Sequence, residues 1–337
     1  MMYDSVKKFV SRHKRKLIIS GALFCSTAYV VYTIKKKLAE KKDKESREYL
    51  ERSRRQQHYE ATENTSNRMI TEFVKQLHVK YFAKNLRIEN IIDKLKKQND
   101  LALWEEMRIC VFTRACLLVY AETMLVITLK IQLNLLGGLV YKSLSQDSPP
   151  ICSKTQEDYL LHFSYFIEDG IQRLEEYLHS KVIKYVQQVP IQEQYNLQEL
   201  EKLFFLIQTE IASDTDSPFR CIDSYMLHQM PQVREALLQD MVNETRELLK
   251  NEEIISVARY CTSHSFNKLM DAITVNTPNR SVNLPTTVKM PFAKWLPIVD
   301  RSTKVTESGD CSLKQNVHLD GKVKVLSANV YEAFCSA

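Results

Sequence analysis

The chain has 337 residues, of which 44% are hydrophobic and 26% charged, and this balance is typical of a folded chain rather than a disordered one. It contains 6 glycines, fewer than a sheet protein with many tight turns needs, so the composition favours helices. The formal net charge of +6 is modest, and much of it lies on either side of an apolar N-terminal run rather than in a basic stripe with interleaved aromatic residues. This pattern argues against nucleic acid as a partner and favours anionic membrane lipids.

The N-terminal region predicts a single membrane-spanning helix. The residues from Leu17 to Ile34 carry no charge, and at 1.5 Å per residue they would cover about 27 Å, enough to cross the hydrocarbon core. Residues 1–16 form a basic segment before this run, and a lysine run rather than a small-residue cleavage site follows it. An uncleaved anchor is therefore favoured over a signal peptide. Lysines and arginines are dense on both flanks, so the sequence leaves the orientation open.

Residues 35–60 follow the anchor and are densely charged, with acidic and basic residues at mixed helical spacings. They predict a solvated juxtamembrane helix. Residues 61–337 show apolar residues at helical spacing, including one helix from Tyr159 to Val186 and a last one from about Gly321 to Phe334. The predicted fold class is therefore all-α, with a single N-terminal transmembrane helix followed by a helical bundle.

The densest apolar pattern predicts a long central helix from about residue 101 to residue 141. It would be roughly 60 Å long and would form the rod of the bundle. Arg114, Glu122 and Lys130 interrupt the apolar run, and placing three charges inside a bilayer would cost several kcal/mol. A buried helix of the bundle is therefore favoured over a second membrane span.

No constellation in the sequence predicts catalysis or metal binding. The eight cysteines form no CxxC pair and lie at no metal-ligand spacing from a histidine, and the histidines are dispersed. A Gly-rich phosphate loop, an HExxH sequence and a GxSxG sequence are missing. We therefore expect no enzyme activity, metal, cofactor or small-molecule substrate, and we interpret the cysteines as reduced thiols of a cytosol-facing body. The helical body is a candidate for recognition.

Seven stretches along the chain are similar, in order, to the peroxin-3 family of peroxisomal membrane biogenesis factors, especially its animal members. They are RHKRKLIISG (12–21), YLERSRRQQHYE (49–60), WEEMRICVFTR (104–114), TMLVITLKIQLNLLGGLVY (123–141), NETRELL (243–249), PFAKWLPIV (291–299) and ANVYEAF (328–334). Each stretch is short, but their order and spacing make the resemblance specific over essentially the whole chain. Segments 93–100, 214–230 and 301–317 depart from the family pattern.

The resemblance implies a function, a partner and a location. Members of this family are single-pass proteins of the peroxisomal membrane with most of the chain in the cytosol. They dock peroxin-19, the soluble chaperone and import receptor that carries newly made peroxisomal membrane proteins. Their body is an elongated helical bundle, and an amphipathic N-terminal helix of peroxin-19 lies in an apolar groove at its membrane-distal end. The resemblance therefore implies docking of peroxin-19 for membrane-protein insertion during peroxisome biogenesis.

The resemblance also assigns candidate docking residues. Trp104 matches the family's groove tryptophan, and a large flat side chain in a groove is a typical anchor for a bound helix. From the residue types alone, a core tryptophan would be favoured, and the resemblance reverses this preference. Ile92 and Leu95 lie on the preceding predicted helix and are candidates for the opposite wall. The departure at residues 93–100 leaves open which of them matches the family's leucine.

Other candidates lie farther from this tryptophan or fit a structural role. Lys294 corresponds to a family lysine at the groove rim, and a solvated lysine is the alternative interpretation. Leu103 and Met107 are weaker candidates that would also fit the core. Three residues of the central helix are interpreted as scaffold, because adjacent glycines permit close helix contact and a buried asparagine needs partners: Asn134, Gly137 and Gly138.

A structural tether is the alternative class of function. Such a protein would join the organelle to another membrane or to the cytoskeleton through exposed charged faces such as residues 35–60. It would tolerate the loss of Trp104, whereas a docking receptor would not.

Overall fold

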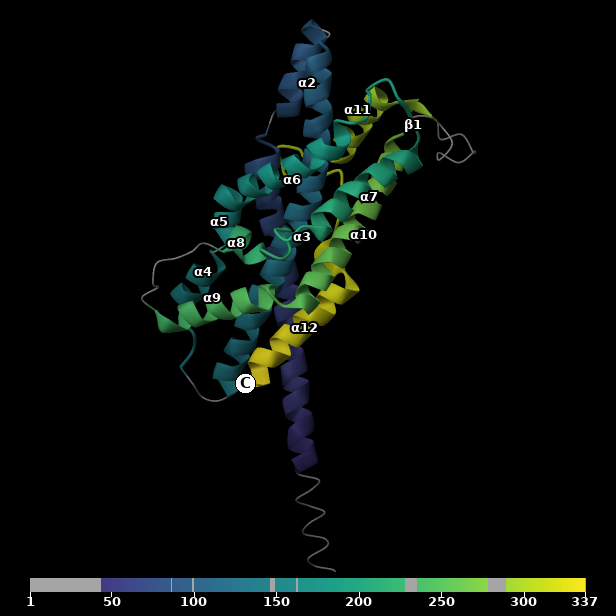
Figure 1. Ribbon diagram of the computed structural model, residues 1–337. Helices are drawn as coiled ribbons and strands as arrows, with labels where there is room; N and C mark the ends of the chain where they lie inside the picture. Colours follow the sequence, from purple (N-terminus) through teal and green to yellow (C-terminus); the bar gives the residue numbers. More distant parts are fainter. Residues whose placement is uncertain are drawn as a thin grey trace, which may run out of the picture. The chain divides into compact units, whose positions relative to one another are not determined.

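The computed structural model describes residues 44–85, 87–98, 100–145, 149–161, 163–227, 235–277 and 289–336, most of which are helical (Figure 1). The chain divides into two compact units, Met1–His58 and Tyr59–Ala337. In the first unit, residues 44–58 are helical and mostly exposed, in agreement with their charge pattern. The predicted anchor from Leu17 to Ile34 and the basic segment before it lie outside the described residues.

The second unit is a helical bundle. It begins with helical residues 59–77 and continues with η1 (His78–Phe82, a π-helix), α2 (Arg87–Lys97), α3 (Leu101–Ser145), α4 (Ser153–Leu160), α5 (Phe163–Tyr165), η2 (Phe166–Gly170, a π-helix), α6 (Ile171–Val186), α7 (Leu197–Ser213), α8 (Ile222–Met226), α9 (Ala236–Leu249), α10 (Glu252–Asn276), α11 (Phe292–Ser302), η4 (Val317–Leu319, a 3₁₀ helix) and α12 (Gly321–Ser336). Two short strands, β1 (Gln194–Tyr195) and β2 (Met290–Pro291), pair antiparallel. The all-α prediction is confirmed.

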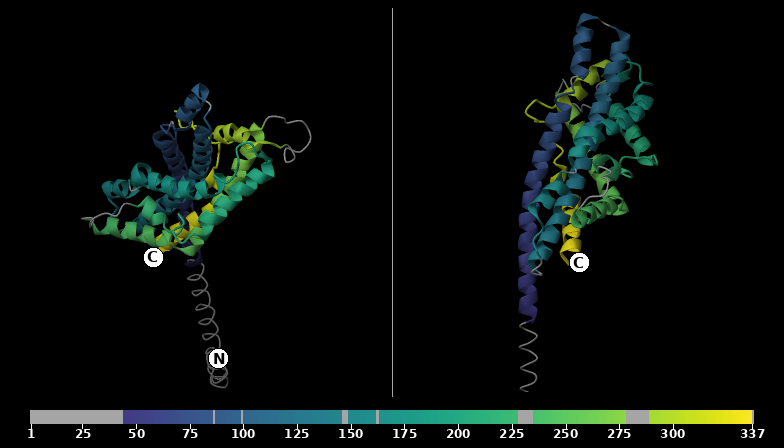
Figure 2. Two further views of the ribbon diagram at one scale, coloured as in Figure 1. Left: turned by 45° about the horizontal axis from the view of Figure 1, so that its top comes forward. Right: turned by 90° about the vertical axis from the view of Figure 1, so that its left-hand side faces the viewer.

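Helix α3 is the core of this unit. Its 45 residues correspond to about 68 Å of helix, and α12, α6, α2, α11, α10 and α9 all pack against it (Figures 1 and 2). Among the described residues, it is the one helix long and apolar enough to cross a membrane, and 89% of its most apolar 18-residue stretch is buried within the protein. The prediction of a buried central helix is confirmed, and the helix continues one turn beyond the predicted end.

The charges that interrupt the apolar run of α3 are paired inside the bundle. Each has partners on another element: Lys130 with Glu63 and Asn67, Glu122 with Gln315, and Arg114 with Asp300. The Nζ atom of Lys130 lies 2.8 Å from Oδ1 of Asn67, and its side chain is fully buried. A buried charge is tolerated when a partner and hydrogen bonds replace the water that it loses. These pairs therefore explain how α3 carries charges without facing solvent.

Two glycines let other helices approach α3 closely. A Cβ atom at Gly138 would lie 2.8 Å from the carbonyl oxygen of Tyr331 on α12, and one at Gly137 would lie 2.6 Å from Cγ2 of Thr62. Asn134 is fully buried, and its side-chain amide donates to the carbonyl of Lys130 at 2.8 Å. This geometry supports the predicted scaffold role of Asn134, Gly137 and Gly138.

The prediction of one continuous helix from Tyr159 to Val186 was wrong, because the structure divides this stretch into several helices. Helix α4 ends at Leu160, and a π-helical turn, η2, lies between α5 and α6. At Gly170 any Cβ atom would overlap the carbonyl oxygen of Tyr225, because α8 crosses the chain at this point. The π-helical turn coincides with this tertiary contact, which the helical periodicity does not reveal.

Candidate partner-binding site

Trp104 lies in the first turn of α3. Two hydrogen bonds to Asp100 fix this turn. The backbone N–H of Ala102 donates to the Asp100 carboxylate at 3.0 Å, and the N–H of Trp104 donates to its carbonyl at 3.3 Å. An aspartate before the first turn satisfies backbone donors that the helix itself cannot pair. The side chain of Trp104 is half-buried and packs against the core. Leu101, one turn earlier, is 60% exposed. The start of α3 therefore presents an aromatic and an aliphatic side chain at the surface.

Helix α2 forms a hairpin with this part of α3 (Figure 2). Its apolar face is turned inward, with Ile88 and Ile91 buried. Ile92 and Leu95 are half-buried and pack against the same core, so each keeps part of its side chain accessible. The structure thus brings Ile92, Leu95 and Trp104 together on one hairpin of two helices.

Two arginines tie this hairpin to its surroundings. The guanidinium of Arg87 lies 3.5 Å from the carboxylate of Glu106, which joins the start of α2 to α3. Arg108, one turn after Trp104, is buried and donates to the carbonyl oxygens of Gln187, at 3.1 Å, and Val189. These bonds hold the chain that follows α6 against α3, so the surface near Trp104 rests on a fixed base.

The weaker candidates occupy different depths. Leu103 is half-buried on α3, whereas Met107 is 5% exposed and belongs to the core. Met107 can therefore support the hairpin from below but offers little surface to a partner. Leu101 was not a sequence candidate, although its place three residues before Trp104 puts both on one helix face.

Lys294 lies on another element. It is exposed on α11, whose contacts with α3 include the stacked rings of Phe112 and Phe292, 5.7 Å apart, and the pair of Arg114 with Asp300. Phe112 is about 12 Å along the helix axis from Trp104, given 1.5 Å per residue. The structure therefore places Lys294 on a helix that packs against α3 and not on the α2–α3 hairpin.

The groups near the hairpin do not form a reactive site. Burial raises the pKa of the Cys110 thiol to about 11, so this cysteine stays protonated and unreactive at neutral pH. The hydrogen bond from Lys96 lowers the pKa of Asp93, an exposed pair at the end of α2. Within the described residues, no group of three or more His, Cys, Asp or Glu side chains is placed to hold a metal ion. The arrangement is suited to holding an apolar partner.

Fold and site define an all-α protein with one buried central helix and an apolar hairpin as its candidate binding surface. The Peroxin-3 family model matches residues 98–143, which include nearly all of α3. The chain is 27% identical to peroxisomal biogenesis factor 3 of Rattus norvegicus over 365 residues, and 27% identical to that of Homo sapiens over 368. Each match covers 99% of this chain and 98% of the relative.

A plant relative extends the comparison. Peroxisome biogenesis protein 3-2 of Arabidopsis thaliana is 20% identical over 342 residues, which cover 90% of this chain and 91% of the relative. The match of the family model to α3, together with relatives that align along nearly the whole chain, shows that the chain is similar to the peroxin-3 family. The names of its relatives support a role in peroxisome biogenesis, and the family is one of biogenesis factors rather than of known enzymes.

Proposed function

We propose that this protein is the docking receptor for peroxin-19 at the peroxisomal membrane, where it serves the insertion of peroxisomal membrane proteins. The observation that carries the proposal is the α2–α3 hairpin, with Trp104 half-buried and Leu101 60% exposed at its end. An amphipathic helix binds by laying its apolar face into a groove between helices, and large aromatic side chains dominate the affinity of such interfaces.

The surroundings of the hairpin fit this partner. Ile92 and Leu95 on α2 would line one wall of the groove and Trp104 on α3 the other, above a floor that includes Ile91 and Met107. Three lysines stand at the end of α2 and would attract acidic residues that flank an apolar helix face: Lys94, Lys96 and Lys97. Lys294 on α11 would contribute from the rim.

The location and orientation form part of the same proposal. The segment from Leu17 to Ile34 would anchor the chain as a single-pass protein, and the unit Tyr59–Ala337 would lie in the cytosol, where peroxin-19 is available. The relatives' name supports the peroxisomal membrane as the compartment.

The test is the affinity of the full chain, in lipid nanodiscs, for a synthetic peptide of the N-terminal amphipathic helix of peroxin-19. We expect Trp104→Ala to weaken binding by about 2 kcal/mol or more, roughly thirtyfold in Kd, because an aromatic anchor would be lost. Isothermal titration calorimetry measures the change, and circular dichroism checks that the variant is folded. Unchanged affinity in a folded variant would remove Trp104 from the site and would favour the tether.

A matched pair of leucines sharpens the test. Leu101 and Leu144 are both exposed on α3, by 60% and 64%, near opposite ends of the helix. We expect Leu101→Ser to weaken peptide binding and Leu144→Ser to leave it unchanged. Equal effects of the two variants would mean that the hairpin is not the docking surface.

A further inference from the structure

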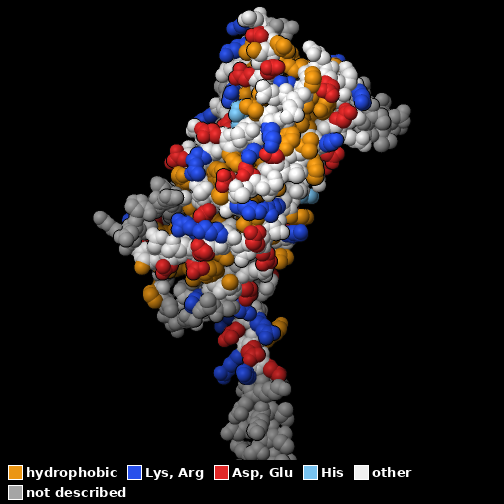
Figure 3. Space-filling view, viewed as in Figure 1, with side chains coloured by type: hydrophobic (Ala, Val, Ile, Leu, Met, Phe, Trp, Pro, Cys, Tyr) orange, Lys and Arg blue, Asp and Glu red, His pale blue; other side chains and the backbone are white. Residues whose placement is uncertain are grey.

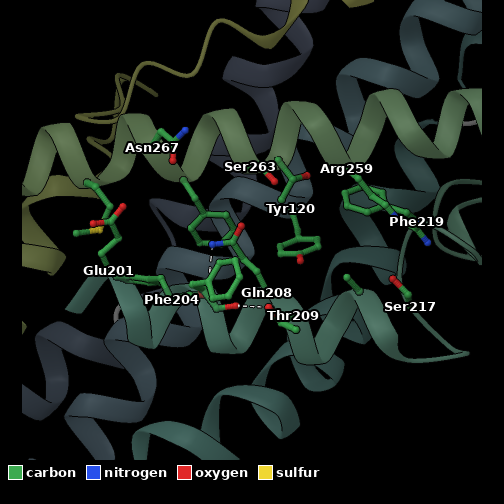
Figure 4. Close-up of a pocket in the computed structure, with 15 residues that line it drawn as sticks. Tyr120, Glu201, Phe204, Gln208, Thr209, Ser217, Phe219, Arg259, Ser263 and Asn267 are labelled. Carbon is green, nitrogen blue, oxygen red and sulfur yellow. Dashed lines mark hydrogen bonds between the residues drawn. The ribbon is translucent and has the colours of Figure 1, made fainter. Parts of the chain in front are cut away.

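A cleft of about 410 Å³ lies between α7 and α10, apart from the α2–α3 hairpin (Figure 4). Its floor is aromatic: the ring of Tyr120 stacks on Phe219 at 5.3 Å between centroids, and Phe266 lies 6.1 Å from Tyr120 and 5.8 Å from Phe204. This size and this apolar lining are typical of small-molecule sites. Hydrophobic side chains also reach the surface along α7, where Phe205 at the cleft is 64% exposed (Figure 3).

Two polar side chains that line one end of the cleft lack partners. The Nε atom of Arg259 is buried without a hydrogen-bond acceptor, and its guanidinium makes no ion pair among the described residues. Ser217 is 1% exposed, and its hydroxyl also has no hydrogen-bond partner in the described part of the chain. Figure 4 shows both toward the same end of the cleft. Leaving such groups unpaired costs free energy, which an acceptor bound in the cleft would recover.

An anion would bind at the end of the cleft that holds Arg259 and Ser217, because other polar side chains in the cleft do not favour one. The amide of Gln208 donates to the carbonyl of Phe204, and the hydroxyl of Thr209 donates to that of Phe205, so α7 itself uses these donors. Glu201 lies toward the opposite end of the cleft, where it would repel a second negative charge (Figure 4). The cleft therefore combines one cationic group with an apolar floor.

We propose that this cleft binds an apolar monocarboxylate, with the carboxylate on Arg259 and Ser217 and the hydrocarbon body on the aromatic floor. A single guanidinium matches the charge and the planar fork of one carboxylate. A phosphate dianion would call for further cationic groups, and Arg259 is the one lysine or arginine in the lining of this cleft. The ligand would be bound and not transformed.

The test uses the full chain in lipid nanodiscs and sodium octanoate as the probe, with octanamide as its uncharged counterpart and empty nanodiscs as the blank. We expect octanoate to bind, and both octanamide and the Arg259→Met variant to show an affinity lower by about tenfold or more. Arg68→Met, which changes an exposed arginine of the helical segment 59–77, is the matched control and should bind octanoate as the unchanged chain does. Isothermal titration calorimetry gives the affinities.

A second variant tests the place of binding. Ser263 lines the cleft from α10 and is exposed, so Ser263→Phe fills the cleft without disturbing the core, and we expect it to abolish octanoate binding. Equal affinity for octanoate and octanamide, or full binding by Ser263→Phe, would overturn the proposal. Absence of octanoate binding, together with slower hydrogen exchange in α7 and α10 when the peroxin-19 peptide is added, would identify the cleft as a protein interface and would also overturn it.

Discussion

Asp214 ends α7 and joins it to α6 through two side chains. Lys181 forms an ion pair with its carboxylate, and the hydroxyl of Tyr177 donates to it at 2.9 Å. The hydrogen bond from Lys181, with further bonds from the backbone of Asp216 and from Tyr177, lowers the pKa of Asp214 from 3.8 to about 2. A carboxylate held by this many donors stabilises the folded chain only while it is ionised.

This carboxylate predicts acid sensitivity. Because the folded-state pKa is the lower one, the stabilisation is complete above about pH 4 and is lost as the pH falls toward 2. We expect the melting temperature of Asp214→Asn to fall less between pH 5 and pH 2 than that of the unchanged chain, although it starts lower. Thermal melts by circular dichroism give both slopes.

The neighbouring Asp216 is the control for this measurement. It is exposed, and its backbone N–H donates to Asp214, so Asp216→Asn keeps that bond. We expect Asp216→Asn to follow the unchanged chain at every pH. A parallel decline of all three melting temperatures would show that Asp214 has no part in the acid response.

At the scale of the elements, the contact of α3 with α12 is the most extensive between any two of the helices α2 to α12. Gly138 is central to it, because an added methyl group would meet the backbone of Tyr331 and the Cβ of Phe334, 2.9 Å away. We expect Gly138→Ala to lower the free energy of unfolding by about 1–3 kcal/mol, the usual range for overpacking. Urea unfolding followed by circular dichroism measures this change.

Gly321 supplies the matched control at the start of α12. A Cβ atom there would meet nothing within 4 Å, and its backbone conformation suits an alanine. We expect Gly321→Ala to change the free energy of unfolding by no more than about 0.5 kcal/mol in either direction. A loss as large as that of Gly138→Ala would mean that helix composition, and not close packing, sets the cost.

The helices that could be predicted from the sequence are those with strong periodicity. The long run of α3 and the pattern of α12 are examples, because each buries a regular apolar face. Helix α11 was not predicted: it carries Pro297 inside the helix, and its place depends on the stacking of Phe292 with Phe112. The apolar residues of α11 do recur at helical spacing, but Pro297 interrupts the pattern, whereas the π-helical turn at Gly170 depends on α8 and has no local signal.

At the scale of the whole molecule, the proposed topology has a direct consequence for glycosylation. Asn64 and Asn243 lie in Asn-X-Thr/Ser sequences and are both exposed, so a glycosyltransferase in a secretory lumen would reach them. We expect neither to be modified when the full chain is expressed in mammalian cells, because the proposed topology places the body in the cytosol. Gel mobility before and after treatment with peptide N-glycosidase F is the measurement.

Variants of Asn64 and Asn243, two of the three Asn-X-Thr/Ser sequences in the chain, make this test specific. A mobility shift that peptide N-glycosidase F removes, and that Asn243→Gln abolishes, would place α9 in a lumen and contradict the orientation. If Asn64→Gln abolished the shift instead, the helical segment 59–77 would lie in a lumen, which would also contradict the orientation. The sequence itself could not decide this point, because basic residues flank the predicted anchor on both sides.

Only part of the candidate site could be predicted from the sequence. Periodicity places Ile92, Leu95 and Trp104 on helices, but it does not tell a groove tryptophan from a core one, and the family resemblance supplied that distinction. The structure adds Leu101, whose exposure depends on where α3 begins. It also shows Met107 in the core, a matter of tertiary packing that helical spacing alone leaves undecided.

The buried position of α3 also has a consequence for the chain while it is being synthesised. Helix α12, which packs against α3, is synthesised well after it, and at 5–20 residues per second it follows α3 by roughly 10 to 35 s. Until its neighbours have packed against it, α3 is a segment hydrophobic enough to be taken for a membrane span. The packing of α12 and the other neighbours on α3 therefore keeps a core helix out of the bilayer, so a variant that weakens this packing would affect targeting as well as stability.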